Sequence, residues 1–390
     1  MIGVLILGSK EYPFGTNRGD DPLPSGGMET YVDDLVPELS KLCRIYIITR
    51  SFRGTRKKEV VGRNITVIRV PWERGRWLRN PSFNICSFAM SFRVAKNADI
   101  IYSNGIISGF FGMVLGKTLR KKSIFRPAGV GFAQYHFPLK QMLYALEKLV
   151  FRKSDAVVFH SDGEKSNAER LFGIKIRRGH VILTGFPVKK FSEGDATMRK
   201  RLGIRKETVI TAVSRFVPVK GLEYLVEACA MLDFDFRLLM VGSGPEEAKL
   251  RSLCRKKGIG DRATFTGFRR DIPDILAATD IFVVSSLFEG LPTSLLEAMA
   301  SGKPCVVTDI GLPVADNETG IIVPHTDSRA ISDALKLLAK NRGLRERLGK
   351  NAKKFVEENC TQEIAARKHL DLFRKLVPGG GDMVSAEGSA

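Results

Sequence analysis

Two glutamates, Glu289 and Glu297, stand eight residues apart where a strand-like run gives way to a helix-like run. The strand is expected to end at Ser285 and the helix to begin at Pro292 or Thr293, because proline suits the first turn of a helix. The free amides of that turn, together with the helix dipole, form a binding site for an anion. The two carboxylates would therefore flank a phosphate-sized pocket. Glu289 could accept hydrogen bonds from sugar hydroxyls, and Glu297 from ribose hydroxyls.

Two cations, Arg215 and Lys220, lie in the segment 214–222, which follows the strand-like run 209–213. Fixed cations lower the barrier of a reaction that builds negative charge on a leaving group. Arg215 and Lys220 could do the work of a metal ion in this way, so we expect no metal and no cofactor. The alternative interpretation is that both are solvated side chains on a loop.

Glycines occur where other predicted strands lead into helices, and glycine lets the backbone approach a ligand closely. Gly26 and Gly27 open a helix in the first half of the chain, where the helix start favours a phosphate. Gly242 and Gly244 follow the strand-like run 236–241. A tight structural turn explains this second pair almost as well as a nearby nucleotide does.

The elements that must position these residues alternate between short apolar runs and amphipathic runs, which predicts parallel α/β sheets with helices on both faces. The first series of predicted strands comprises 2–7, 45–49, 66–70, 100–102, 123–125 and 156–160. The second series comprises 209–213, 236–241, 263–266, 281–285, 305–308 and 320–323.

The repeated series predicts two Rossmann-like, doubly wound domains that face a central cleft. The boundaries are residues 1–187 for the first domain and 188–376 for the second, because Gly185 and Pro187 punctuate the chain near the junction. Residues 377–390 are rich in Gly, Ser and Ala and are expected to be a disordered tail. Ligands of open α/β sheets sit beyond the carboxyl ends of the strands, so the cleft is the expected site.

The stretch from Ser285 to Pro304 closely resembles the signature of family-4 glycosyltransferases of the GT-B fold, in which two glutamates are separated by seven residues. Arg215 to Gly221 resembles the family's R-x-x-x-x-K-G segment, and Gly26 to Glu29 its G-G-x-E loop. The resemblance is dense over residues 214–324 and thin before residue 150. It implies hexosyl transfer with retention of configuration from a nucleotide-diphosphate sugar, with a UDP-sugar favoured and a GDP-sugar next.

The resemblance also implies a role for each motif residue. Arg215 and Lys220 would hold the donor diphosphate, Glu289 would orient the donor sugar, and Glu297 would bind the ribose. The remaining expected donor-binding residues are Gly26, Gly27, Gly242, Gly244, Gly267, Phe268, Gly290, Leu291, Pro292 and Thr293. The departing diphosphate oxygen would take the acceptor proton, whereas retaining glycosidases use a carboxylate nucleophile.

The acceptor side departs from the family pattern. Many members carry a histidine after the fourth or fifth N-terminal strand, and Asn104 and Ala128 stand in those places here. Asparagine can hydrogen-bond a sugar hydroxyl but cannot take a proton near neutrality. Arg126 could compensate by binding phosphate, and His136 is the best histidine candidate for acceptor contact. Asn104, Arg126 and His136 therefore form the candidate acceptor site, whereas His160 is expected to be structural.

The formal net charge of +20 is concentrated in residues 51–150, where 18 Lys and Arg stand against 4 Asp and Glu. This imbalance predicts an anionic partner, although a solvated basic surface is the simpler alternative. Basic and aromatic residues that suit a lipid headgroup interface are Arg53, Arg56, Lys57, Lys58, Trp72, Arg74, Arg76, Trp77 and Arg79.

These features predict a cytoplasmic enzyme that is peripheral on the inner face of the cell membrane and uses a lipid-linked or phosphorylated acceptor. A soluble polysaccharide or small-molecule acceptor is the alternative. A catalytically silent nucleotide-binding scaffold is a second, because the family histidine is missing. A nucleic-acid-binding protein is a third, but no nucleic-acid motif accompanies the charge. Asp233-Phe234-Asp235 spells a metal motif of another glycosyltransferase fold, but its position before the run 236–241 argues against a metal role.

Overall fold

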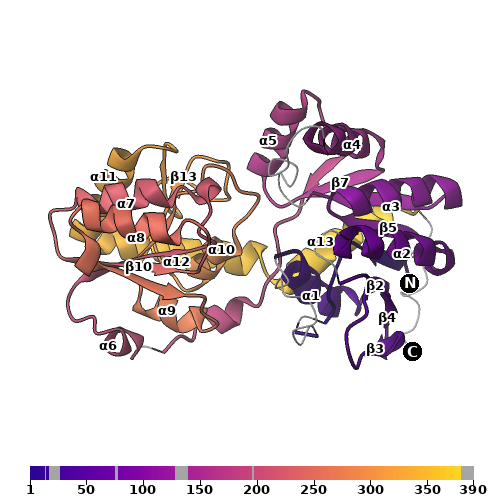
Figure 1. Cartoon of the computed structure of the whole chain (residues 1–390), viewed down its shortest axis with the longest axis horizontal. Helices are drawn as coiled ribbons and strands as arrows, with labels where there is room; N and C mark the ends of the chain where they lie inside the picture. Colours follow the sequence, from indigo (N-terminus) through magenta and orange to yellow (C-terminus); the bar gives the residue numbers. More distant parts are fainter. Residues whose placement is uncertain (14, 17–26, 75–77, 128–138, 196, 379–390) are drawn as a thin grey trace, which may run out of the picture. The chain divides into compact units, whose positions relative to one another are not determined.

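The computed structural model describes the chain except for residues 14, 17–26, 75–77, 128–138, 196 and 379–390. The chain divides into two compact α/β units (Figure 1). The first unit comprises Met1–His160, Lys165–Phe186 and Gln362–Ala390. The second unit comprises Ser161–Glu164 and Pro187–Thr361. The predicted fold class is confirmed, because each unit is built on a sheet of mainly parallel strands covered by helices.

The first unit contains an eight-stranded sheet of order β3-β4-β2-β1-β5-β6-β7-β8. The strands are β1 (Gly3–Leu7), β2 (Arg44–Arg50), β3 (Lys58–Val61), β4 (Ile65–Val70), β5 (Ile100–Asn104), β6 (Lys122–Arg126), β7 (Ala156–Phe159) and β8 (Gly179–Val181). The helices are α1 (Gly27–Leu39), α2 (Arg79–Val94), α3 (Ile106–Leu119), α4 (Leu139–Lys153), α5 (Asp162–Phe172, which begins among residues of the second unit) and α13 (Gln362–Leu376).

The second unit contains a six-stranded parallel sheet of order β11-β10-β9-β12-β13-β14. The strands are β9 (Thr208–Val213), β10 (Phe236–Val241), β11 (Ala263–Gly267), β12 (Ile281–Val284), β13 (Cys305–Thr308) and β14 (Ile321–Val323). The helices are α6 (Met198–Arg201), α7 (Leu222–Ala230), α8 (Glu247–Lys256), α9 (Ile272–Ala278), α10 (Thr293–Ala300), α11 (Ser328–Lys340) and α12 (Arg342–Asn359).

Two strands of the first sheet have no counterpart in the prediction. Among the described strands of this sheet only β3 pairs antiparallel, and its burial alternates between exposed and half-buried, so its sequence lacks an apolar run. β8 has only three residues, all half-buried. Short or exposed edge strands such as these leave a weak sequence signal.

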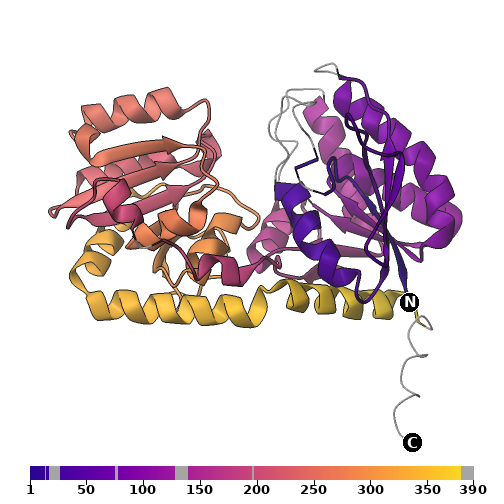
Figure 2. The same cartoon turned by 90° about the horizontal axis from the view of Figure 1, so that it is seen from below.

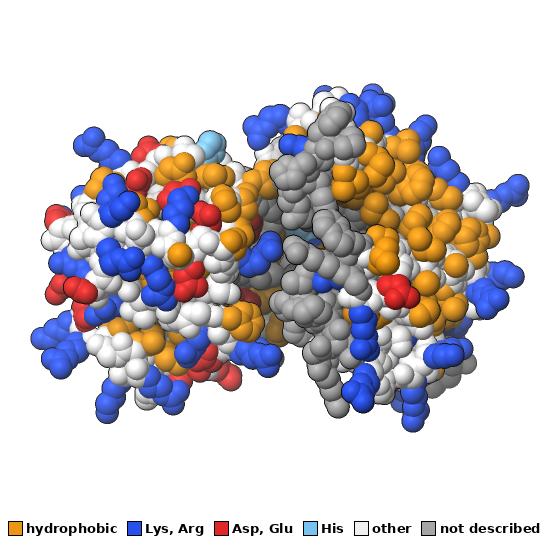
Figure 3. Space-filling model, in the orientation of Figure 1, with side chains coloured by type: hydrophobic (Ala, Val, Ile, Leu, Met, Phe, Trp, Pro, Cys, Tyr) orange, Lys and Arg blue, Asp and Glu red, His pale blue; other side chains and the backbone are white. Residues whose placement is uncertain are grey.

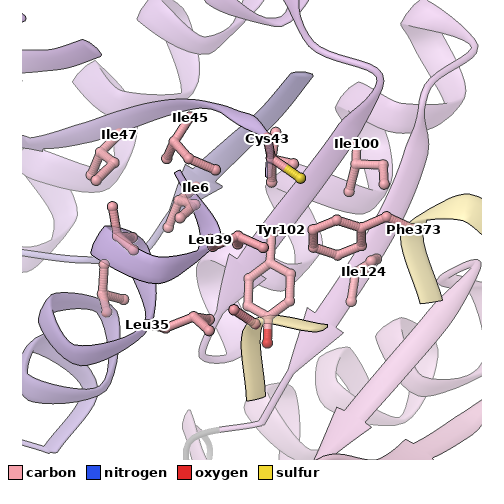
Figure 4. Close-up of a cluster of buried hydrophobic side chains, with 14 of the residues drawn as sticks. Ile6, Leu35, Leu39, Cys43, Ile45, Ile47, Ile100, Tyr102, Ile124 and Phe373 are labelled. Carbon is pink, nitrogen blue, oxygen red and sulfur yellow. The ribbon is translucent and has the colours of Figure 1, made fainter. Parts of the chain in front are cut away.

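The central strand β1 is buried at every position, so both of its faces are covered. Val4 and Ile6 pack in a cluster that includes side chains of α1 and α13, and Leu5 and Leu7 pack in a second cluster with α2. Successive strand residues point to opposite faces of a sheet, so this division places α1 and α13 on one face and α2 on the other. Figure 4 shows part of the first cluster.

The C-terminal helix α13 belongs to the first unit, whereas the sequence interpretation had placed residues 188–376 in the second domain. Ala365, Ala366, Leu372 and Phe373 of this helix are buried in the cluster of β1 and α1. Figure 2 shows α13, in yellow, lying along the first unit. The packing of its apolar side therefore places α13 in the first unit, although this helix follows the second unit in the sequence.

His369 of α13 lies in a buried polar contact with two tyrosines of the same unit. Its Nε2 is 3.1 Å from the hydroxyl oxygens of both Tyr31 and Tyr102, which are 2.9 Å from each other. Its Nδ1 is 2.7 Å from the carbonyl oxygen of Ala365, which can only accept, so Nδ1 donates and Nε2 accepts. Burial lowers the pKa of His369 to about 4. The imidazole is therefore neutral at pH 7.

None of the helices in the described ranges is both long enough and apolar enough to cross a bilayer.

The buried neutral His369 predicts a pH dependence of stability. Its folded pKa of about 4 lies below the model value of 6.5, so between these two values the unfolded chain binds a proton that the folded chain does not. Above pH 6.5 this difference contributes its full amount, roughly 3 kcal/mol, to the free energy of unfolding, and the contribution is lost as the pH falls toward 4. We expect His369→Gln to flatten the fall in the free energy of unfolding across this window in urea titrations. The exposed His325→Gln is the control, and an unchanged slope in His369→Gln would refute the assignment.

Candidate active site

The predicted catalytic residues follow two neighbouring strands of the second sheet. Lys220 ends the short 3-10 helix after β9, and Glu289 lies in the loop between β12 and α10. β9 and β12 pair in parallel, so their carboxyl ends meet at one edge of the sheet. The Nζ of Lys220 forms an ion pair with Oε1 of Glu289, and 14% of each side chain is exposed. Residues 69 positions apart are thus joined at the expected edge.

Backbone hydrogen bonds hold the two loops together beside this ion pair. The amide of Leu287 donates to the carbonyl oxygen of Val219 at 2.8 Å. The hydroxyl of Ser285 donates to the carbonyl oxygen of Lys220 at 3.0 Å. The ion pair is therefore set in a fixed frame, and the Glu289 carboxylate has a defined orientation.

Gly221 explains why a glycine follows the lysine in this segment. Its φ is +55°, in the left-handed region, and a Cβ at this position would lie 2.3 Å from the carbonyl oxygen of Ser285. A side chain would therefore be strained by its backbone and would push the β9 and β12 loops apart. The glycine permits the close approach on which the Lys220–Glu289 contact depends.

Arg215 lies in the first part of the same loop, and its side chain is exposed. Within the described ranges, that side chain has no hydrogen bond or ion pair. Its neighbours are fixed through the backbone, because the amide of Phe216 donates to the carbonyl oxygen of Ser243 at 2.9 Å. The guanidinium is thus free to meet an anion, while the chain that carries it is anchored.

The turn containing Gly242 and Gly244 has a structural role that the prediction had weighed against nucleotide contact. A Cβ on Gly242 would lie 1.9 Å from the carbonyl oxygen of Ser214, and one on Gly244 would lie 2.3 Å from that of Phe216. Both glycines are therefore required for this turn to pack against the loop that carries Arg215.

Gly267 and Phe268 lie at the end of β11, next to this turn. The amide of Gly242 donates to the carbonyl oxygen of Gly267 at 2.9 Å, and Gly267 has a φ of +70°. The Phe268 side chain is 74% exposed. An exposed aromatic ring at the carboxyl edge of a parallel sheet is placed to stack on a planar ligand.

The remaining donor-side residues surround the start of α10. Gly290, Leu291 and Pro292 are half-buried in the preceding loop, and Thr293 is exposed at the first position of the helix. Ser294 anchors the helix, because its hydroxyl donates to the carbonyl oxygen of Val213 at 2.9 Å. The helix start is therefore tied to the end of β9.

Glu297 is half-buried one turn into α10. It lies on the same helix whose start carries Thr293, and it follows the loop that carries Glu289. The Arg215, Lys220, Glu289 and Glu297 segments thus all belong to elements at the carboxyl ends of β9 and β12.

In the first unit, Asn104 and Arg126 end the neighbouring parallel strands β5 and β6, and both are buried. Nη1 of Arg126 donates to Oδ1 of Asn104 at 3.4 Å, and Nδ2 of Asn104 donates to the carbonyl oxygen of Leu7 at 3.2 Å. The Arg126 guanidinium also lies 3.8 Å from the centre of the Tyr31 ring. The structure therefore brings two of the three predicted acceptor residues together. The third, His136, lies outside the described residues, as do Gly26 and Ala128.

Gly27 is the first residue of α1, at the start of the helix expected to receive a phosphate. Glu29 of the same loop is buried, and its Oε1 accepts a hydrogen bond from the amide of Lys10 at 3.3 Å. This contact ties the start of α1 to the loop after β1.

Sequence reasoning missed the polar cluster beneath Arg126. The rings of Tyr31 and His160 are 5.3 Å apart, and Nδ1 of His160 lies 3.0 Å from Oγ1 of Thr184. Burial, followed by the charge of Arg126, lowers the pKa of His160 well below its ordinary value. This histidine is therefore neutral at pH 7. No spacing in the sequence links these residues, because strands and helices far apart along the chain bring them together.

Two other expectations can be compared with the structure. Trp72 is not a free surface aromatic, because its Nε1 donates to the carbonyl oxygen of Ser51 at 2.8 Å and Arg50 lies 4.6 Å over its ring. Asp233 is exposed and pairs with Lys340 of α11 at 3.5 Å. Across the described ranges, no three His, Cys, Asp or Glu side chains gather in a way that could hold a metal ion.

The close approach at Gly221 gives a direct test of the frame. Gly203 is a matched control, because its φ is +67° and a Cβ there would meet nothing within 4 Å. We expect Gly203→Ala to lower the free energy of unfolding by about 1 kcal/mol, from backbone strain alone. Gly221→Ala should lower it by a further 1–3 kcal/mol or so, because of the clash with Ser285. Urea unfolding measures both, and equal losses would show that the approach does not require glycine.

Comparison with protein families agrees with this geometry. The family described as "Glycosyl transferases group 1" matches residues 195–355, and "Glycosyltransferase Family 4" matches residues 25–190. Together the two matches cover more than four-fifths of the 390 residues.

Among curated relatives, the chain is similar to an N,N'-diacetylbacillosaminyl-diphospho-undecaprenol alpha-1,3-N-acetylgalactosaminyltransferase of Campylobacter jejuni. The two are 27% identical over 85% of this chain and 91% of the relative. The chain is also 28% identical to an alpha-D-kanosaminyltransferase of Streptomyces kanamyceticus. That match spans 59% of this chain and 63% of the relative.

Two solved structures share the fold. A sucrose-phosphate synthase from Thermosynechococcus elongatus has a TM-score of 0.78 and 24% identity, over 96% of this chain and 99% of that one. The HepE protein of Anabaena, solved in complex with UDP-glucose, has a TM-score of 0.76 and 19% identity, over 96% and 100%. The family matches to both halves, the GT-B fold and the motif residues gathered at one sheet edge lead to one conclusion: the chain belongs to the family-4 glycosyltransferases of the GT-B fold.

Proposed function

We propose that the protein transfers a sugar from a nucleotide-diphosphate sugar to a hydroxyl acceptor with retention of anomeric configuration and without a metal ion. A UDP-sugar is the favoured donor and a GDP-sugar the next. The observation that carries the proposal is the Lys220–Glu289 ion pair at the carboxyl edge of the second sheet, with Arg215 exposed on the same loop. The preference for UDP rests on the likeness to HepE, whose structure holds UDP-glucose.

In the proposed reaction, the bond between the anomeric carbon and the diphosphate oxygen breaks as the acceptor hydroxyl attacks from the same face. A bond forms between the anomeric carbon and the acceptor oxygen, and the acceptor proton passes to the departing diphosphate oxygen. Arg215 and Lys220 stabilise the charge that develops on the diphosphate. Glu289 accepts hydrogen bonds from the sugar, and Glu297 accepts them from the ribose.

Lys220 takes part with its charge partly balanced by Glu289. A fully free lysine would bind the diphosphate of substrate and product strongly. A lysine already paired with a carboxylate binds the diphosphate of the bound substrate less strongly. Its interaction with the diphosphate strengthens as negative charge appears there during bond cleavage. Only interactions that strengthen in the transition state raise the rate of the chemical step.

We propose a lipid-linked or phosphorylated acceptor. The name of the Campylobacter jejuni relative includes a diphospho-undecaprenol acceptor, and residues 51–150 of this chain carry the basic excess that such a phosphate requires. Arg126 is a charged group at the carboxyl edge of the first sheet, where acceptor contact is proposed with Asn104 and His136. Such an enzyme would work as a peripheral protein on the inner face of the cell membrane.

A catalytically silent, nucleotide-binding GT-B scaffold is the second candidate. The observation that favours it is Asn104, which stands where many family members carry a histidine and is already engaged with Leu7 and Arg126. Because the proposed reaction passes the acceptor proton to the diphosphate, it does not need a base at Asn104. Donor binding without turnover on any phosphorylated or lipid-linked acceptor would favour the scaffold.

Thermal stabilisation by nucleoside diphosphates and nucleotide sugars tests the donor site. A ligand at one hundred times its Kd adds about 2.7 kcal/mol of stability, which raises Tm by several degrees. We expect one nucleotide class to stabilise the wild type, and Glu297→Ala to lose most of that shift. The exposed Glu357→Ala on α12 is the matched control and should keep it. If no nucleotide shifts the wild type, the donor-site proposal is wrong.

A further inference from the structure

The helix α3 is apolar on all sides, and both small and large residues of it are buried. Its glycines face the sheet: a Cβ on Gly109 would lie 2.6 Å from the Phe125 ring, and one on Gly112 would lie 2.0 Å from Oγ of Ser103. The small residues therefore allow a close helix-to-sheet approach. Two of its bulky residues, Phe110 and Phe111, are only half-buried.

An ordinary surface helix of an α/β protein turns its large apolar residues inward and its polar residues toward water. α3 departs from this pattern on its outer side: Met113 and Leu115 are buried as expected, but Phe110 and Phe111 are partly exposed. Among its 14 residues the only charged side chain is Lys117, in the last turn.

The apolar side of α3 continues onto the helices beside it. The ring of Phe111 stacks on Phe88 of α2 with centroids 4.4 Å apart, and Phe110 packs in the cluster that contains Leu143 of α4. We define the three-helix apolar face as Ile85, Phe88, Phe110, Phe111, Leu139 and Met142. Ile85 is 64% exposed and Met142 is 58% exposed. Figure 3 shows hydrophobic side chains gathered over α2, α3 and α4.

The charged side chains of the three helices that carry this face are mostly basic. Basic residues of α2, α3 and α4 are Arg79, Arg93, Lys117, Lys140, Lys148, Arg152 and Lys153. Within these three helices, which the structure describes from end to end, the one acidic residue is Glu147, and it is buried. Figure 3 shows Lys and Arg side chains along much of the edge of the hydrophobic region, and acidic atoms at one place beside it.

We propose that the three-helix apolar face is the surface by which this protein docks on an anionic lipid bilayer. Apolar side chains would enter the boundary between headgroups and acyl chains, and the surrounding lysines and arginines would contact anionic headgroups. Docking on the bilayer would bring a lipid-linked acceptor within reach of the enzyme. Only this link to the acceptor rests on the proposed function.

A second copy of the chain fits this face less well. Two copies joined through it would bring the basic edges of both molecules together, and like charges at an interface cost several kcal/mol. An anionic bilayer instead attracts each basic residue. The bilayer therefore satisfies both the apolar centre and the basic edge, whereas a dimer satisfies only the first.

Co-sedimentation with phospholipid vesicles tests the proposal with the full chain and no nucleotide. The wild type should bind vesicles of 30% phosphatidylglycerol in phosphatidylcholine, bind pure phosphatidylcholine far less, and lose affinity as salt rises. The double variant Ile85→Asn, Met142→Asn should bind the anionic vesicles about tenfold more weakly, because two exposed apolar side chains no longer enter the bilayer. Both side chains are well exposed, so the fold should be kept, which an unchanged Tm would show.

Leu337→Asn is the matched control, because Leu337 is 48% exposed and belongs to α11 of the second unit. It should bind vesicles as the wild type does. Equal vesicle binding by the double variant and the wild type would overturn the proposal, and so would a wild type that does not bind anionic vesicles. A wild-type dimer that the double variant converts to a monomer, without vesicle binding, would assign the face to a second copy.

The same preparations separate this inference from the proposed function. The double variant should keep the nucleotide-induced rise in Tm, because Ile85 and Met142 lie on α2 and α4, which carry none of the proposed donor-binding residues. Lost vesicle binding with an intact nucleotide shift supports the docking face. A normal nucleotide shift together with a wild type that ignores vesicles would overturn the docking face and leave the transferase proposal standing.

Discussion

The ion pair between Lys220 and Glu289 is the interaction on which the candidate active site depends. It joins the loops after two parallel strands, β9 and β12, whose register places both carboxyl ends at one sheet edge. The backbone bond from Leu287 to Val219 and the close approach at Gly221 fix the distance between these loops. The turn at Gly242 and Gly244 then fixes the segment that carries Arg215. A cation, a carboxylate and a helix start are thus held by backbone contacts, which keeps them in place before any ligand arrives.

The first unit holds a buried arginine at the carboxyl edge of its sheet. Arg126 is buried among Asn104 and the ring of Tyr31, and the nearby His160 and His369 are held neutral by burial. Neutral imidazoles let a guanidinium sit in the interior without a second positive charge beside it. His369 comes from α13, so the last described helix of the chain completes the environment of the proposed acceptor residues.

Much of the second unit could be predicted from the sequence because its strands are uniform apolar runs and its motifs are local. Glu289, Glu297 and Gly290 lie within nine residues, so their proximity follows from chain connectivity. The pairing of Lys220 with Glu289 required the order of the strands, which composition does not contain. The sequence also did not predict which side of α3 faces the sheet, because a helix that is apolar all round has no amphipathic pattern to indicate its inner side. The membership of α13 in the first unit depends on tertiary packing of Phe373, not on its place in the chain.

The most direct test of the account is the affinity of Glu289→Gln for the nucleotide sugar that stabilises the wild type most, compared with its affinity for the matching nucleoside diphosphate. If Glu289 holds the sugar, the wild type prefers the nucleotide sugar, and calorimetry should show that the substitution reduces this preference by roughly tenfold, the cost of losing a hydrogen bond to a charged group. The ratio of the two Kd values cancels any effect of the freed Lys220 on the diphosphate. An unchanged ratio would contradict the account, because the carboxylate would then have no contact with the sugar.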